Sequence, residues 1–422
     1  MRTLARTSSG PYEIRMNEKF LTEGFVILPD VVPPDQLDSL RDTVDKLVEL
    51  HRAVDESWDT NPTPRVDMGR YVDAKTDQAL RFVLGETTFG VSTQLLGCSP
   101  DSVALSSMSV LCNPEFEPDA PPPSGQSWGT DPRNWHRDIR PDHDAPLSAL
   151  LADERANGPA YTQWNIALYD DSILHLIPGS HRRLTSEVER TQLREEGGTR
   201  SRLSGSLRAE LKPGSGVVYN SMLLHWGSKY SNRQKRRTVH LGYRSFGRIV
   251  PTQRDCALTK RICDILPKDT PPQRAIERSF ALYREEFNTY EEAFRAVVAG
   301  DADRFHTALT HLHPAKEGRL TCIILLSRLA RNVNDFSGSR DDQVRFNSGT
   351  QTATVEMQQQ LTSRFTPTDI DKLWARFGKL DASLRTTETT HVSGFLGPPT
   401  NYLYEQLPAD LSAESAVATL FA

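Results

Sequence analysis

Three residues of the types that bind metal ions lie in two short motifs far apart in the chain. His136 and Asp138 belong to the segment NWHRDIR, and His225 belongs to LLHWGS. Because one residue separates His136 from Asp138, an extended strand places both side chains on the same face. Two imidazoles and one carboxylate are the ligand set of non-haem Fe(II) oxygenases, and they leave coordination positions open. We therefore interpret these three residues as candidate metal ligands.

An arginine follows the distal histidine at a spacing that suits cosubstrate binding. Arg236 lies 11 residues after His225, at the start of the predicted strand RRTVHLGYRSF. Its guanidinium can pair bidentately with the far carboxylate of 2-oxoglutarate, which an ammonium could not match. Arg237 is the alternative, because strand alternation lets one of the two arginines point into a barrel.

The alternative for each of these residues is a structural role. His136 and Asp138 alone could form a surface pair, and the presence of His225 and Arg236 is what favours a metal site. Other histidines on turns or predicted strands are interpreted as structural: His143, His175, His181 and His240. Three more in RFHTALTHLHP resemble a cluster but have no acidic partner on the shared helical face, so we predict an ordinary helix surface: His306, His311 and His313.

The elements that must position the candidate ligands are predicted to be short strands. Segments between about residues 100 and 248 are rich in β-branched and aromatic residues and are separated by Gly, Pro, Asn or Asp. Such a series indicates a sandwich or barrel. The Pro-rich stretch 113–134 leads directly to His136, and we predict that it is a long loop that acts as a lid.

Helices are predicted on both sides of the strand-rich part. Residues 34–53 have helical spacing and follow a short strand at 25–28. After about residue 252, apolar residues at helical spacing predict a helix over 273–299 and a second helix that starts after Gly300-Asp301. A further helix is predicted over 366–385, where T-P-T-D resembles a capping box. The carboxy-terminal third is therefore predicted to be helical.

Composition excludes several classes of protein. Of 422 residues, 37% are apolar and 25% are charged, so the chain can bury a core, and the net charge of −5 argues against binding nucleic acid through phosphate contacts. No apolar run is long enough for a membrane helix, and the start lacks the apolar region of a secretory signal. The five cysteines form no C-x-x-C pair, which favours reduced thiols in a cytoplasmic protein.

Several segments together resemble the phytanoyl-CoA dioxygenase-like (PhyH) family of Fe(II)/2-oxoglutarate oxygenases. They are FLTEGFVILPDVVPPDQLDSLR, WHRD, LIPGSHRR and HWGSKYSNRQKRR, and the resemblance covers about residues 15–250. It implies that His136, Asp138 and His225 hold iron and that Arg236 binds the C5 carboxylate of 2-oxoglutarate. It also implies that Ser228 helps to hold that carboxylate.

The resemblance places Trp164, in QWNIAL, beside the cosubstrate. The polar-Asn-Gly turn that the family has after this aromatic residue is shortened here to YDDS, which weakens the assignment. Related halogenases replace the carboxylate ligand with a small residue. Because Asp138 is present, the resemblance implies hydroxylation or another oxidative outcome.

The implied fold is a double-stranded β-helix (a cupin-type jelly roll), mainly β, with amino-terminal helices packed on one sheet. We expect a flexible tail over 1–14, the oxygenase domain over 15–252 and a helical region over 253–422. Two roles compete for the helical region. It either covers the active site as a lid or forms a homodimer interface.

The implied function is that of a 2-oxoglutarate-dependent dioxygenase. It would hydroxylate a small metabolite or natural-product intermediate with O2 and release succinate and CO2. Basic residues flank the candidate site and form either a solvated rim or a field that attracts an anionic substrate: Arg137, Arg140, Lys229, Arg233, Lys235, Arg237 and Arg244. A non-catalytic cupin-like metal- or ligand-binding protein is the alternative, and a zinc-dependent hydrolase with the same ligands is a third option.

Overall fold

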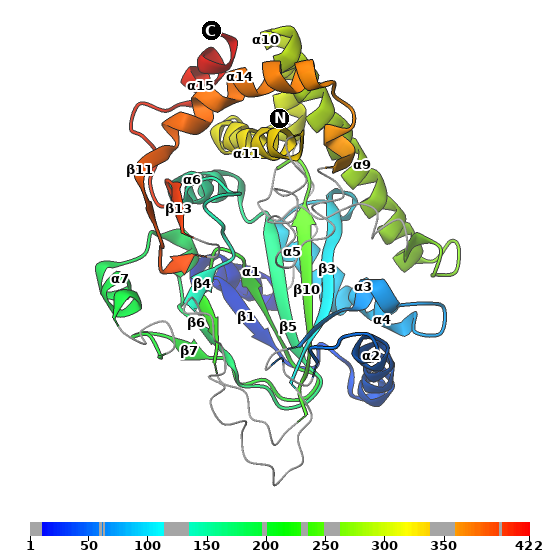
Figure 1. Cartoon of the computed structure of the whole chain (residues 1–422). Coiled ribbons are helices and arrows are strands. Elements are labelled where there is room, and N and C mark those ends of the chain that lie inside the picture. The colour runs from blue at the N-terminus through cyan, green and yellow to red at the C-terminus, as the bar shows by residue number, and fades with distance from the viewer. Residues whose placement is uncertain are drawn as a thin grey trace.

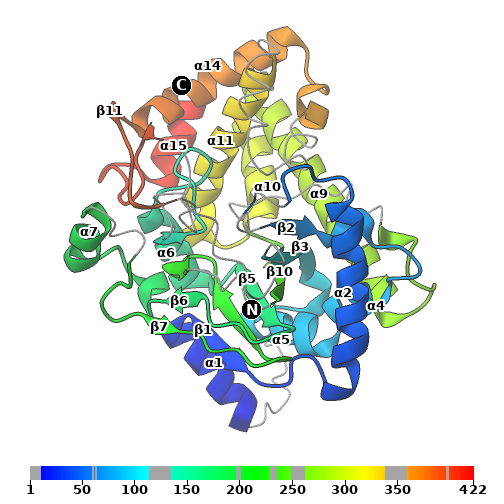
Figure 2. The ribbon, with the colours of Figure 1, turned by 60° about the horizontal axis from the view of Figure 1, so that its bottom comes forward.

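The fold contains two main β-sheets and two groups of helices. The computed structural model describes residues 11–58, 61, 64–113, 135–195, 201–228, 235–248, 262–337, 359–395 and 399–422. Figure 1 shows the sheets in the middle of the molecule, with α2 and α4 beside one sheet and the carboxy-terminal helices together at one end. Figure 2 shows the same arrangement from a second direction.

The larger sheet has six strands in the order β1-β8-β5-β10-β3-β2, and each neighbouring pair is antiparallel. Its strands confirm the short strands predicted from the sequence. In chain order they are β1 (Phe25–Leu28), β2 (Arg65–Asp67), β3 (Val103–Cys112), β5 (Tyr161–Ala167), β8 (Gly216–Asn220) and β10 (Arg237–Ser245).

The smaller sheet has five strands in the order β12-β4-β9-β6-β7. They are β4 (Trp135–Arg137), β6 (Leu174–Leu176), β7 (Leu207–Arg208), β9 (His225–Gly227) and β12 (Gly394–Phe395). Strand β12 comes from the carboxy-terminal region and pairs in parallel with β4, with Gly394 opposite His136. The remaining pairs are antiparallel.

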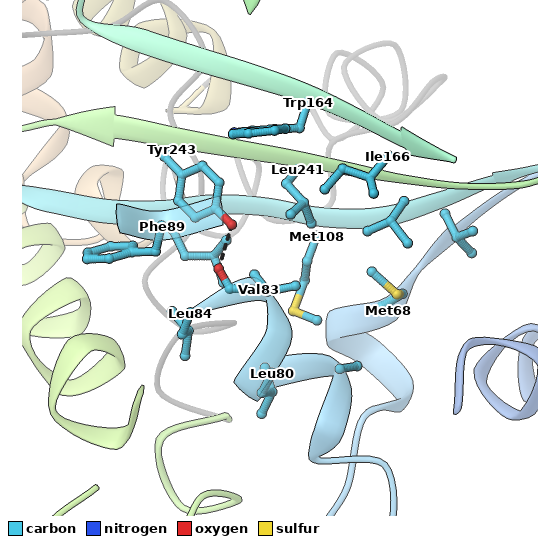
Figure 3. Close-up of a cluster of buried hydrophobic side chains, with 14 of the residues drawn as sticks. Met68, Leu80, Val83, Leu84, Phe89, Met108, Trp164, Ile166, Leu241 and Tyr243 are labelled. Atoms are coloured by element: carbon cyan, nitrogen blue, oxygen red, sulfur yellow. Dashed lines mark hydrogen bonds between the residues drawn. The ribbon is translucent and has the colours of Figure 1, made fainter. Parts of the chain in front are cut away.

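Alternation along β5 and β10 puts apolar residues on one face of the six-stranded sheet and polar residues on the other. On β10, Val239, Leu241 and Tyr243 belong to a core that the sheet shares with the amino-terminal helices, whereas His240 faces the other way and contacts Asn165. Figure 3 shows this core. The helices that cover it are α2 (Leu37–Arg52), α3 (Met68–Tyr71), α4 (Gln78–Val83) and α5 (Val91–Leu96). The other face, which is the polar face of β5 and β10, is turned toward the five-stranded sheet. Along β1 and β8 this face is apolar and forms a further core with β6.

The predicted helices on both sides of the strands are confirmed. The segment predicted over 34–53 forms a 3-10 turn and then α2, and α1 (Pro11–Glu23) precedes it. The carboxy-terminal helices are α9 (Pro271–Ala299), α10 (Ala302–Leu312), α11 (Arg319–Ser337), α14 (Pro367–Ser383) and α15 (Ala413–Phe421). A capping box between Thr366 and Asp369 starts α14, as T-P-T-D predicted. In the described part of the chain, no helix is long and apolar enough to span a membrane.

A second core joins the carboxy-terminal helices to the strand-rich part. It includes apolar residues of α6 (Leu147–Asn157) as well as Ile139 and Met222, which flank the candidate site in the sequence. The apolar side of α9, including Tyr283, Phe287 and Phe294, is buried within this chain. The boundary predicted near residue 252 lies outside the described residues, as do residues 1–10 of the predicted tail.

Candidate metal centre

The three predicted metal ligands lie together. His136 and His225 are directly opposite each other on the antiparallel strands β4 and β9, and Asp138 follows β4. One donor atom from each of the three residues lies within 4.8 Å of the others. The pairing of two strands that are far apart in the sequence therefore places two imidazoles and one carboxylate around a single point.

Hydrogen bonding orients the ligand atoms of this cluster. Nδ1 of His225 lies 2.8 Å from the carbonyl oxygen of Leu223, and donation to that carbonyl leaves a lone pair on Nε2 for a metal ion. Nε2 of His225 is 3.5 Å from Oδ2 of Asp138, and Nε2 of His136 is 3.6 Å from Oδ1. These distances suit donor atoms that share one metal ion.

The site stabilises the protonation states that metal binding requires. Burial and the nearby His136 lower the pKa of His225 to about 4, so its ring is neutral at neutral pH. Burial alone would raise the pKa of Asp138. The charge that His225 carries in the acid range where Asp138 titrates, and the hydrogen bonds from His136 and Gln163, hold this pKa well below its usual range. A neutral imidazole and an ionised carboxylate are the forms that bind metals.

Gln163 is a site residue that the sequence analysis missed. Its Nε2 donates to Oδ2 of Asp138 at 2.8 Å and to the hydroxyl of Tyr219 at 3.0 Å. The signal was present, because the alternation of β5 puts Gln163 and Asn165 on one face and Trp164 on the other. The sequence did not show which of these faces is turned toward the ligands.

Trp164 is not brought to the metal-ligand cluster. Its buried ring belongs to the core on the helix-covered face of the six-stranded sheet (Figure 3). Its Nε1 donates to Oγ of Ser92 at 2.8 Å. The cosubstrate contact expected from the resemblance therefore has no support in this structure. Gln163 is the neighbouring residue of β5 that contacts the ligands.

Arg236 and Arg237 point to opposite faces of the sheet. Arg236 is buried, and its Nε donates to Oδ2 of Asp171 at 2.8 Å. Nε of Arg237 donates to Oδ1 of Asp45 on α2, also at 2.8 Å. The alternation predicted from the sequence thus places Arg236 on the polar face, which is also the face of His240 four residues later.

Asp171 fixes the position of the Arg236 guanidinium. Its carboxylate also accepts hydrogen bonds from the hydroxyl of Thr238 and the backbone amide of Ile173. Burial opposes ionisation, but the charge of Arg236 and these hydrogen bonds lower the pKa of Asp171. Asp171 lies in the segment YDDS, so this ion pair occupies the place where the sequence departs from the family turn.

Ser228 lies directly after β9 and next to this ion pair. Its backbone amide donates to the carbonyl oxygen of Ile173 at 2.8 Å, and the amide of Ile173 in turn donates to Asp171. Ser228 is thus near Arg236 in the fold. Its contact with the 2-oxoglutarate carboxylate stays a prediction.

The histidines predicted to be structural have structural contacts. His181 is buried with Nε2 3.2 Å from the carbonyl oxygen of Leu21, and Nδ1 of His240 lies 2.7 Å from Oδ1 of Asn165. The prediction of an ordinary helix surface holds for His311, which is exposed beside Glu285, but is wrong for His313. His313 ends α10 and is fully buried against Asp153, a partner 160 positions earlier that helical spacing could not indicate.

Four of the five described members of the basic set, all except Arg140, have side-chain hydrogen bonds or ion pairs with other groups of the protein. Arg137 donates to the carbonyl oxygens of Ser180 and Met222, and Arg244 forms a buried ion pair with Glu286 of α9. Lys235 joins Arg237 at Asp45. Lys229, Arg233 and residues 114–134 of the predicted lid loop lie outside the described residues.

The donor set fits one divalent cation. Two imidazoles and one carboxylate on one side of a metal are the facial triad of non-haem Fe(II) oxygenases. The sequence profile of phytanoyl-CoA dioxygenase (PhyH) matches residues 20–238, which is more than half of the chain. The chain belongs to the phytanoyl-CoA dioxygenase family. This membership and the triad support the predicted cofactors, Fe(II) and 2-oxoglutarate, and imply a small-molecule substrate and O2.

Solved structures similar to the chain include the non-heme alpha ketoglutarate dependent epimerase SnoN from nogalamycin biosynthesis. The match has 17% identity, covers 56% of this chain and 83% of SnoN, and has a TM-score of 0.38. EctD from S. alaskensis matches with 17% identity, coverage of 58% and 80%, and a TM-score of 0.40. AviO1 from Streptomyces viridochromogenes Tue57 matches with 18% identity, coverage of 56% and 97%, and a TM-score of 0.38. No curated protein matches the chain.

Proposed function

We propose that this protein is a dioxygenase that uses Fe(II) and 2-oxoglutarate to hydroxylate a small molecule, with release of succinate and CO2. The observation that carries the proposal is the meeting of His136, Asp138 and His225 at one point. The ion-paired Arg236 lies on the polar face of the same fold, where it can receive a dicarboxylate. Family membership supports the same assignment.

The chain's own residues position the reactants. When bound, ferrous iron with 2-oxoglutarate and O2 supplies the oxidation of a C–H bond. His136, Asp138 and His225 hold the metal from one side, which leaves the other side open for reactants. Arg236 forms charge-assisted hydrogen bonds to the distal carboxylate of 2-oxoglutarate, and Asp171 keeps the guanidinium in position. Gln163 keeps the Asp138 carboxylate turned toward the histidines.

We also propose that the two sheets form the double-stranded β-helix expected from the resemblance. The hydrogen bond from Gln163 on β5 to Asp138 supports this, because it links the six-stranded sheet to the residue that follows β4 of the five-stranded sheet. A fold of this type holds the metal between its sheets.

For the carboxy-terminal region we propose the lid role rather than the homodimer role. The apolar face of α9, which suggested an interface, is buried within the chain. Glu286 of α9 pairs with Arg244 of β10, and β12 extends the sheet that carries His136. Dimerisation and a cytoplasmic location stay predictions from the sequence.

Anaerobic spectroscopy followed by product analysis tests the function. Addition of Fe(II) and 2-oxoglutarate to the protein should give a weak visible charge-transfer band, and admission of O2 should then release succinate. Asp138→Ala and His225→Ala should abolish both signals. His311→Ala is the matched control, because His311 is exposed on α10 and should leave both unchanged.

The outcomes separate the competing functions. A band that forms without any succinate, across a panel of small metabolites, would support a non-catalytic binding protein. If no band forms in the unaltered protein, and Zn(II) binds tightly in a way that depends on His225, a zinc-dependent hydrolase would be supported. Either result would contradict the proposed dioxygenase.

A further inference from the structure

A small cavity borders the metal ligand Asp138. Its volume is about 40 Å³, and it lies where the start of β5, the segment after β10 and α6 come together. Arg236 precedes β10 and Arg248 of the cavity wall follows it, so the two guanidinium groups belong to opposite ends of the strand. The cavity therefore approaches Asp138 from the end of the sheet that is opposite the proposed 2-oxoglutarate site.

The wall of this cavity combines apolar side chains with two carboxyl groups and one guanidinium besides Asp138. Ile139, Leu150 and Met222 are apolar, and all three also belong to the carboxy-terminal core. The carboxyl and guanidinium groups are those of Asp153, Glu154 and Arg248. This composition suits a substrate with a short aliphatic part and one charged or strongly polar end.

Asp153 and Arg248 each have a hydrogen-bond partner elsewhere in the protein. The carboxylate of Asp153 lies 3.0 Å from Nε2 of His313 and accepts a hydrogen bond of 2.7 Å from Nδ2 of Asn157. Arg248 donates to the carbonyl oxygen of Gly158. These contacts hold Asp153 and Arg248 against the wall.

Glu154 is the group with remaining capacity to accept hydrogen bonds. Among the described residues it has one hydrogen-bond partner, the side-chain amide of Asn220. The orientation of that amide is fixed, because its oxygen accepts from the backbone amide of Met222 at 2.8 Å. Nδ2 of Asn220 therefore faces Glu154 as a donor to one carboxylate oxygen, which leaves the second oxygen for a ligand.

Among the described residues, Glu154 forms no ion pair, although Arg248 lines the same cavity. Burial raises the pKa of this carboxyl to about 8; the Asn220 hydrogen bond and the charge of Arg248 oppose that shift, and the charge of Asp153 adds to it. Burial of a carboxylate is costly unless a positive partner accompanies it. A cation that enters the cavity would offset this cost, whereas an anion would add to it.

The basic residues that could have favoured an anionic substrate do not change this balance. Arg137 is bound to two backbone carbonyl groups, and Arg244 is paired with Glu286. Among the described residues of the cavity wall, Arg248 is the one basic side chain. The wall has two carboxyl groups, those of Asp153 and Glu154, even if Asp138 is left out as a metal ligand.

We propose that this cavity is the amine-binding part of the substrate site and that it holds the protonated primary amine of a small aliphatic substrate through Glu154. A volume of about 40 Å³ admits the ammonium end and the carbon next to it, beside Leu150, Ile139 and Met222, and the rest of the substrate extends out of the cavity. The assignment of the cavity as a substrate site rests on the proposed function, whereas amine binding by Glu154 can be measured without turnover.

Three probes of similar size test the charge preference: butylammonium, butanol and butyrate. Their binding to the full-length protein is measured by ligand-observed NMR titration at pH 9, where Glu154 is ionised and butylammonium keeps its proton. We expect butylammonium to bind at least tenfold more tightly than butanol, and butyrate to bind least. Glu154→Gln keeps the shape of the side chain and should lower the affinity for butylammonium at least tenfold. Glu210→Gln, at an exposed position, is the matched control and should have no effect.

A second variant distinguishes the opposite charge preference. Arg248→Met should leave butylammonium binding intact or strengthen it, because a like charge is removed. Tighter binding of butyrate than of butylammonium, with loss in Arg248→Met, would overturn the proposal. Butylammonium binding that is unchanged in Glu154→Gln would also overturn the proposal. Urea unfolding of each variant shows whether a loss of binding is a loss of folding. Glu154-dependent amine binding in a protein that releases no succinate would contradict the dioxygenase and leave the amine site standing.

Discussion

Gln163 Nε2 lies 2.8 Å from Oδ2 of Asp138 and joins the two sheets at the metal centre. The same nitrogen donates to the hydroxyl of Tyr219 at 3.0 Å, so the amide is held on one side by β8 and holds the carboxylate on the other. The orientation of the only acidic ligand in the triad therefore depends on a residue of the opposite sheet.

Gln163→Leu removes this hydrogen bond and should weaken metal binding. Loss of a partner that orients a metal ligand typically costs about 10–100-fold in affinity. Mn(II) titration followed by electron paramagnetic resonance measures this loss. Tyr219→Phe is the control, because it preserves the bond from Gln163 to Asp138, and it should have a smaller effect. Equal losses in both variants would show that Gln163 does not act through Asp138.

Arg236→Lys and Arg237→Lys should have different consequences. A lysine at 236 loses the paired donors of the guanidinium, so the KM for 2-oxoglutarate should rise at least tenfold. A lysine at 237 faces α2 and Asp45, so it should lower stability to urea and leave KM unchanged. The initial rate of succinate release at varied 2-oxoglutarate provides KM. A rise in KM for the Arg237 variant alone would contradict the assignment of faces.

Glu286→Ala should destabilise the attachment of α9 to the sheet. The change leaves Arg244 buried without its carboxylate, and breaking a buried ion pair in this way costs about 3–5 kcal/mol. Removing both charges with Arg244→Met and Glu286→Leu should cost much less, because no charge stays unpaired. Urea unfolding measures both. A double variant as unstable as Glu286→Ala would show that packing, rather than charge, sets the effect.

Glu189 should make stability depend on pH in the acid range. Burial opposes its ionisation, but hydrogen bonds from Arg183 and from the backbone of Ser186 lower its pKa to about 2, below the usual 4.5. A lowered carboxyl pKa stabilises the fold above about pH 4.5, and this contribution is lost as the pH falls toward 2.

Glu189→Gln should therefore cost about 1–3 kcal/mol at pH 7 and progressively less between pH 4.5 and pH 2. Urea unfolding of both proteins across this range measures the difference. A difference that does not change with pH would mean that the capping geometry of α7 (Glu187–Arg194), rather than the charge of Glu189, provides the stabilisation.

The sequence by itself determined the local elements and the residue types of the site. The spacing of His136 and Asp138 required an extended segment to bring them to one face, and β4 has that conformation up to Arg137. Apolar periodicity predicted α2, α9 and α14, because helix formation depends mainly on residues a few positions apart. Residue type indicated the distal His225 as the third ligand and the family motif supported it, although no local spacing connects it with His136.

The tertiary structure decided which face of each strand the site uses. Alternation on β5 and β10 allowed either Trp164 or Gln163, and either Arg236 or Arg237, to face the ligands. The packing of α2–α5 on one face of the six-stranded sheet settled both choices, because the apolar residues went to that core. His313 and β12 were likewise beyond sequence reasoning, since their partners Asp153 and β4 are brought to them only when distant segments pack together.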